Sequence, residues 1–106
     1  MAKYLVEATY SGDGLKGLQR DKGSGRKQAV TAAVESLGGK VDALYFALGE
    51  RDVLVIVDLP DVASVAALSV GVSATGLVRT RTTPLLTVEE ADRALAKAFE
   101  YRAPKA

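Results

Sequence analysis

Residues 37–61 read LGGKVDALYFALGERDVLVIVDLPD, and this stretch decides the fold. Two runs of β-forming residues, 41–48 and 53–59, stand on either side of a short polar segment. So short a gap between two strands predicts an antiparallel hairpin. The hairpin therefore forms the middle of the chain, and the segments on both sides of it have to pack around it.

Helical patterns flank the hairpin on both sides. Residues 14–37 read as a helix with a glycine-rich interruption, and the second half repeats apolar residues three and four positions apart. Residues 62–73 form a second helix, rich in Ala and Ser. The outer segments 3–10 and 77–83 read as strands. The resulting order, β-α-β-β-α-β, predicts an α+β, ferredoxin-like fold: a four-stranded antiparallel sheet with two helices on one face.

An extra C-terminal helix is predicted after the sheet. Thr87-Val88-Glu89-Glu90 matches a capping box, with Thr87 as N-cap and Glu90 at N3, and the helix is expected to continue to about Glu100. With 106 residues, 48% of them hydrophobic, the chain is long enough for one domain with its own core. We expect residues 1–106 to form that single domain.

Alternation along the strands sorts their residues into two faces. The face expected under the helices carries Tyr4, Val6, Ala8, Leu44, Phe46, Leu54 and Ile56. The opposite face is expected to carry Leu5, Glu7, Thr9, Ala43, Tyr45, Val53, Val55, Val57, Arg79 and Arg81. The middle of that second face is too apolar for water. We therefore expect a second copy of the chain to cover it, giving a homodimer or a higher homo-oligomer.

Several classes of function are disfavoured by composition. Without Cys or His, the chain has no thiolate nucleophile, zinc–thiolate site or histidine base, and no carboxylate cluster has metal-ligand spacing, so no metal or other cofactor is expected. A net charge of +1 gives no reason to expect nucleic acid as a partner. No apolar stretch approaches the roughly 20 residues of a membrane span, and the first strand lacks the apolar block of a secretory signal. We expect a cytoplasmic protein, and the composition disfavours an enzyme without deciding the question.

Two phosphate-binding patterns fail on context. Residues 12–17 read GDGLKG, a literal GxGxxG, but the acid that a dinucleotide site needs about 20 residues later is missing from the end of a second parallel strand. We interpret these glycines as a loosened helix entry. A basic run follows, but residues 11–40 contain no aromatic residue for base stacking, and we interpret it as a solvated helix face. The run comprises Lys16, Arg20, Lys22, Arg26 and Lys27.

The candidate ligand-binding residues are Glu7, Tyr45, Arg79 and Arg81, which share the helix-free face. Glu7 is expected opposite one of the two Arg, because the first and last strands are neighbours in this topology. One interpretation is a polar layer that fixes the register of a dimer. The other is a small anionic ligand held between the sheets by the two Arg, with Tyr45 as donor or acid.

The hairpin turn offers a second group of candidates, Gly49, Arg51 and Asp52. Gly49 permits a positive φ, and the Asp52 side chain can bond nearby backbone N–H groups. These residues are therefore interpreted as turn or rim residues, with Arg51 pointing to solvent or to the rim of a partner. A contact with a ligand is the alternative.

The hairpin, together with GLKGL at 14–18 and VRTRTTPLLTVEEADRAL at 78–95, resembles the GYD-domain family of small bacterial proteins. That family is named for a Gly-Tyr-Asp turn between two strands, and this chain has Arg51 where the family usually has Tyr. The resemblance implies a dimeric α/β barrel, in which two four-stranded sheets close face to face, and implies no activity. The missing His and the charged residues of the helix-free face, rather than the resemblance, favour a non-catalytic homo-oligomer that binds a small anion between its sheets. The alternative is a cofactor-independent enzyme of the same barrel group, similar to a monooxygenase or isomerase, acting on a small organic molecule.

Overall fold

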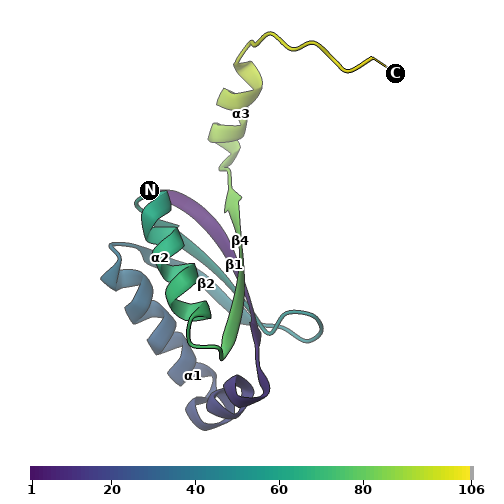
Figure 1. Cartoon of the computed structure of the whole chain (residues 1–106). Coiled ribbons are helices and arrows are strands. Elements are labelled where there is room, and N and C mark those ends of the chain that lie inside the picture. Colours follow the sequence, from purple (N-terminus) through teal and green to yellow (C-terminus); the bar gives the residue numbers. More distant parts are fainter. Residues whose placement is uncertain (106) are drawn as a thin grey trace.

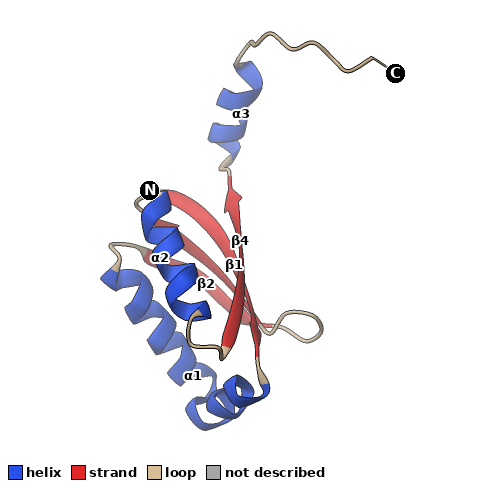
Figure 2. Cartoon of the chain, in the orientation of Figure 1, coloured by secondary structure: helices blue, strands red, loops and turns tan. Residues whose placement is uncertain are grey.

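The computed structural model describes residues 1–105 and shows an α+β fold with a four-stranded antiparallel sheet (Figure 1). The strands lie in the order β2-β3-β1-β4, and α1 and α2 cover the same face (Figure 2). This is the ferredoxin-like arrangement that the sequence predicts. The elements are β1 (Ala2–Tyr10), α1 (Gly12–Ser36), β2 (Lys40–Phe46), β3 (Val53–Leu59), α2 (Val62–Ser73), β4 (Val78–Leu85) and α3 (Val88–Ala96).

The hydrophobic core lies between the sheet and the two helices. The central strands β1 and β3 supply most of it, because most of their inward residues are Val or Tyr and fit a pleated surface. From α1, Val34 is fully buried, and Leu59 at the end of β3 is equally inaccessible. The buried set is Tyr4, Val6, Ala8, Val34, Val53, Val55, Val57, Leu59, Val65 and Val78.

The predicted faces are right for β1, β2 and β4 and wrong for β3. Val55 pairs with Val6, and Leu54 pairs with Glu7, and residues paired across neighbouring strands share a face. The valines of β3 therefore lie under the helices, while Leu54 and Ile56 lie on the helix-free face. The error has a simple cause: residues 53–57 are all aliphatic, so this strand carries no alternation from which to read its phase.

Three elements end two or more residues away from the predicted C-terminal end. β2 ends at Phe46, before the predicted Leu48. β4 continues through Pro84, which is tolerated because β4 is an edge strand and a proline needs no pairing partner on the open side. Instead of continuing to Glu100, α3 ends at Ala96.

The capping box of α3 is formed as predicted. Glu90 N donates to Thr87 Oγ1 at 3.1 Å, and Thr87 N donates to Glu90 Oε1 at 3.0 Å. The helix projects beyond the end of the sheet, away from α1 and α2 (Figure 1), and none of its residues is buried.

Candidate functional site

The helix-free side of the sheet, called here the open face, has an apolar centre between two charged ends. One row across the strands runs Tyr45, Leu54, Glu7, Arg81. The apolar centre consists of half-buried side chains from the first three strands, namely Leu5, Ala43, Leu54 and Ile56. A partly buried apolar surface bordered by charges is typical of an interaction site.

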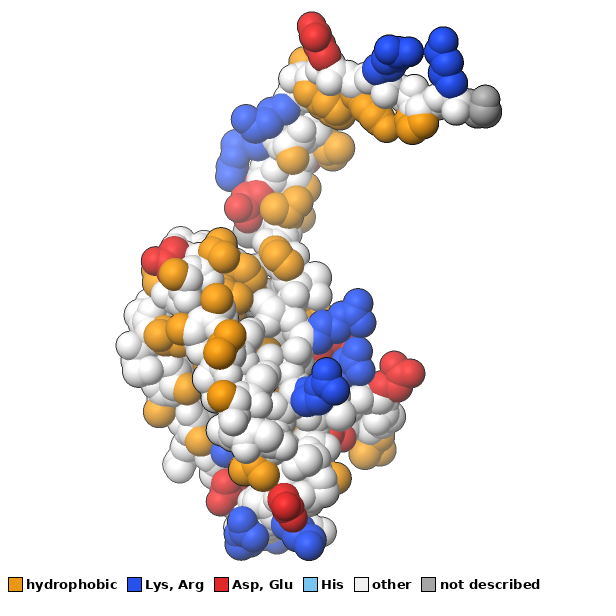
Figure 3. All heavy atoms as spheres, in the orientation of Figure 1, with side chains coloured by type: hydrophobic (Ala, Val, Ile, Leu, Met, Phe, Trp, Pro, Cys, Tyr) orange, Lys and Arg blue, Asp and Glu red, His pale blue; other side chains and the backbone are white. Residues whose placement is uncertain are grey.

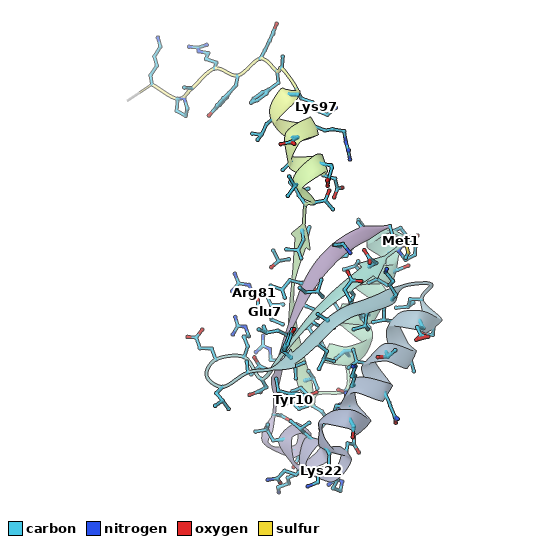
Figure 4. The ribbon with its side chains drawn as sticks, turned by 180° about the vertical axis from the view of Figure 1, so that it is seen from behind. Met1, Glu7, Tyr10, Lys22, Arg81 and Lys97 are labelled. Carbon is cyan, nitrogen blue, oxygen red and sulfur yellow. The ribbon has the colours of Figure 1, made fainter. Side chains whose placement is uncertain are left out.

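An arginine-lined hollow occupies one end of the open face, where β1 and β4 meet the β2–β3 hairpin. We call it the arginine hollow; its volume is ≈ 310 Å³. Arg51 Nε lies 3.5 Å from Glu7 Oε2, so the hairpin loop is tied to β1 by an ion pair. Figure 4 shows Glu7 and Arg81 beside each other at this end of the sheet. The lining residues are Glu7, Thr9, Arg51, Arg79, Thr80 and Arg81.

The hollow carries an excess of positive charge. Three guanidinium groups against one carboxylate give its lining a net charge of +2. Within residues 1–105, Arg79 and Arg81 form no ion pair, and both are exposed. Arg51 Nε is inaccessible to solvent yet donates no hydrogen bond within the described chain. Basic side chains gather on this flank of the body (Figure 3), and planar guanidinium groups suit a carboxylate or phosphate.

The hairpin turn positions Arg51. Gly49 adopts a φ of 120°, and Ala47 N donates to the Asp52 carbonyl at 2.8 Å. The Asp52 carboxylate accepts from Tyr10 N at 2.8 Å, which fastens the hairpin to the end of β1. These bonds place Arg51 half-buried over the open face and against Glu7, whereas we expected it to point to solvent or to a partner's rim.

A second charged cluster occupies the opposite end of the open face, and sequence reasoning missed it. Lys3 Nζ donates to Asp42 and to Asp58, whose Oδ2 lies 3.0 Å away. Lys40 Nζ lies 3.8 Å from Asp42 Oδ1. The bond to Asp42 is the main cause that raises the pKa of Lys3, and the same bond lowers the pKa of Asp42. Asp58 is 5% exposed. Asp58 lies two and four positions after Ile56 and Leu54, so all three side chains point to the same face of β3. The polar Asp58 was therefore the signal that would have assigned Leu54 and Ile56 to the open face.

The predicted site residues come together only in part. Glu7 and Arg81 are direct cross-strand partners, and Arg79 lies one row further along, opposite Thr9. Glu7 thus lies opposite one of the two Arg, as expected, but its carboxylate forms its ion pair with Arg51. Tyr45 is 68% exposed on the far edge strand, three strand spacings or about 14 Å from Arg81. Tyr45 is therefore outside the arginine hollow.

The glycine motif has a packing role at one of its positions. A Cβ on Gly14 would stand 2.2 Å from the carbonyl oxygen of Leu77, so α1 can begin close to the start of β4 only without a side chain there. Ser11 caps the helix by accepting from Gly14 N at 3.0 Å. The structure thus explains why a glycine stands at the entry of α1.

The basic run following that motif splits at a kink in α1. Lys22 has a φ of 63°, which interrupts the helix. Arg26 turns inward. Its Nη1 lies 3.8 Å from Asp21 Oδ2, and its Nε donates to the Tyr10 hydroxyl at 3.4 Å. The other members, Lys16, Arg20 and Lys27, are exposed. This arrangement matches a solvated helix face.

The comparison with protein families matches the GYD domain over residues 4–95, which includes the hairpin turn and all of the sheet except Ala2 and Lys3 at the start of β1. The chain belongs to the GYD-domain family. No curated protein and no solved structure matches this GYD domain. Within residues 1–105, no cluster of three or more acidic side chains is arranged to hold a metal ion. None of the helices described in this GYD domain is long and apolar enough to cross a membrane.

Proposed function

We propose that this GYD-domain protein is a non-catalytic homodimer that pairs through the open face and holds a small anion in the arginine hollow. The observation that carries the proposal is the position of Arg79 and Arg81. These two guanidinium groups stand without carboxylate partners in the described chain, beside the half-buried Arg51–Glu7 pair and next to an apolar centre.

Pairing of two open faces follows from the apolar centre. Leu5, Leu54 and Ile56 are only half-buried in one copy. Two sheets that pack face to face lie about 10 Å apart and bury the side chains between them. A second copy supplies a surface of matching shape and polarity, because the same apolar row is repeated by the two-fold symmetry of a dimer.

We propose an anion because covering the arginine hollow with a second sheet removes water from its guanidinium groups, which costs free energy. A second sheet over the open face lowers the local dielectric, and an uncompensated guanidinium in such a place costs several kcal/mol. A carboxylate or phosphate group placed between Arg51, Arg79 and Arg81 offsets that cost through bidentate, charge-assisted hydrogen bonds. Glu7 holds Arg51 in place and neutralises only one of the three cations.

A thermal-shift titration with inorganic phosphate and with oxalate tests the anion site. We expect both anions to raise the melting temperature of the wild type, and this rise to be lost in Arg81→Ala. Arg20→Ala is the matched control, because it removes an exposed arginine from α1, and its response should equal that of the wild type. Equal stabilisation of wild type and Arg81→Ala, or no stabilisation of the wild type by either anion, contradicts the proposed anion site.

A further inference from the structure

The segment that follows β4 carries apolar side chains that nothing in the described chain covers. Residues 86–105, called here the C-terminal arm, comprise the α3 segment and an extended tail beyond the sheet (Figure 3). Leu95 is 84% exposed and Phe99 is 83% exposed. Leu86, Val88 and Tyr101 are exposed as well. A nine-residue helix is too short to be stable alone in water, so the arm requires a surface to pack on.

The two ends of the open face differ in charge. The arginine hollow has a net positive lining. At the other end, two Lys and two Asp balance, and the beginning of α3 adds three carboxylates, Glu89, Glu90 and Asp92, against Arg93. If the two-fold axis of a face-to-face dimer ran along the strands, the arginine hollows of both copies would lie at the same end of the dimer. The guanidinium groups of the two copies would then repel each other. An axis across the strands brings each hollow to the acidic end of the other copy.

The sheet register then says which residues meet. The centre of the face is the row in which Leu5 pairs with Ile56 and Thr83. An axis across the strands in this row places β4 of one copy over β4 of the other, running in the opposite direction. Arg79 precedes Thr83 by four residues, so it faces the position four residues after Thr83, which is Thr87, the N-cap of α3. In two aligned sheets that pack face to face, the strand directions differ by no more than about 30°. Arg79 of one copy therefore stays near Thr87 of the other.

The chain next to α3 favours docking on a second copy over folding back. No glycine follows Gly76, Pro84 stiffens the end of β4, and Thr87 is extended with φ −71° and ψ 164°. The arm therefore continues away from its own sheet (Figure 1). Its five large apolar side chains present on the order of 600 Å². Complete burial of these side chains in two exchanged arms, counted with the surface they cover, gives an upper limit of about 2,400 Å², against the 1,200–2,000 Å² of a standard stable interface.

We propose that the C-terminal arm of each copy docks on the other copy at the rim of its arginine hollow, with Glu89 and Asp92 of the arm next to Arg79. This inference rests on the proposed face-to-face dimer and assigns its axis and a further pair of contacts. Arg79, outermost in the hollow, lies between the arm and the anion and donates to both, while Arg81 and Arg51 donate to the anion alone. Glu90 is excluded from the contact because its carboxylate is bonded to Thr87 N within the capping box.

A charge exchange between two full-length variants tests the contact. The arm variant is Glu89→Lys with Asp92→Lys, and the hollow variant is Arg79→Glu. In each homodimer, like charges then meet at two symmetric places, and we expect the dissociation constant to rise about tenfold or more. In a heterodimer of the two variants, both places again have opposite charges. An equal mixture should therefore give mainly heterodimer by native mass spectrometry, where indifferent mixing gives half.

The controls separate this inference from the dimer itself. Glu35→Lys makes the same kind of charge change on the exposed side of α1 and should leave the dissociation constant unchanged. Far-UV circular dichroism verifies that each variant is folded. A monomeric wild type contradicts both the dimer and the arm contact. A dimeric wild type whose two variants dimerise equally well, or whose mixture contains only half heterodimer, leaves the dimer standing and overturns the arm contact.

Discussion

Replacing Ile56 by Asp should separate the two copies while the chain stays folded, whereas Val55→Asp should unfold it. The two residues are neighbours on β3 and point to opposite sides of the sheet. Val55 is 4% exposed in the core under the helices. Ile56 is half-buried on the open face, in the central row next to Leu5. The pair of substitutions therefore compares the two faces within a single strand.

The magnitudes follow from burial. Covering the remaining surface of Ile56 contributes about 1 kcal/mol, and the two-fold symmetry repeats it, so about 2 kcal/mol of association free energy is lost. Burying an unpaired carboxylate in each copy adds several kcal/mol. At 1.4 kcal/mol per factor of ten, the dissociation constant should rise more than about a hundredfold. In Val55→Asp, a buried carboxylate without partners opposes folding against a total stability of only about 5–15 kcal/mol.

Sedimentation equilibrium measures the association, and urea unfolding followed by circular dichroism measures the fold. Ile56→Asp should be monomeric and unfold cooperatively, and Ile56→Val should remain dimeric. A dimeric Ile56→Asp refutes pairing through the open face. A folded, monomeric Val55→Asp refutes the assignment of the β3 valines to the core.

Three further predictions concern local contacts. Lys3→Met should lower the free energy of unfolding at neutral pH. The difference from wild type should shrink in urea titrations as the pH falls below about 3.8 through the lowered pKa of Asp42, because the protonated carboxyl no longer pairs with Lys3. Asp52→Ala should cost about 1–3 kcal/mol and lower the melting temperature, because Tyr10 N loses a charge-assisted bond; an unchanged melting temperature contradicts the hairpin clamp. Thr87→Ala should cost α3 about 1 kcal/mol, seen as faster amide exchange within that helix only.

The sequence predicts the order of the elements because turns and helices leave local signals. The hairpin, the capping box and the start of the second helix at Val62 depend on residues a few positions apart, and the structure contains all three. The phase of β3 depends on its pairing with other strands. Five consecutive aliphatics fit both faces equally well, so only the polar residue Asp58, with its partner Lys3, identifies the open side.

The candidate site was predictable only where it depends on strand parity. Glu7, Arg79 and Arg81 fall on one face by alternation, and the structure places them at one end of the sheet. Arg51 joins them through the hairpin loop, whose path depends on the bond between Asp52 and the distant Tyr10 N. No spacing rule connects residues so far apart in sequence. For the same reason Tyr45, although on the correct face, is separated from the arginines by two strands.

In the proposed dimer, the positions of the arginines would couple anion binding to association. A site on the surface of one sheet holds an anion in water, where exposed ion pairs contribute little. The same site between two sheets is partly dehydrated, and its affinity rises because the guanidinium groups lose their competing water. A ligand that binds the dimer and not the monomer stabilises the dimer by an amount that depends on its concentration, about 2.7 kcal/mol per site at a hundred times its dissociation constant. The two symmetric hollows of the proposed dimer would double this contribution, so an anion at that concentration would strengthen association by roughly four orders of magnitude. In the proposed dimer, the level of a small anion would thereby set the oligomeric state.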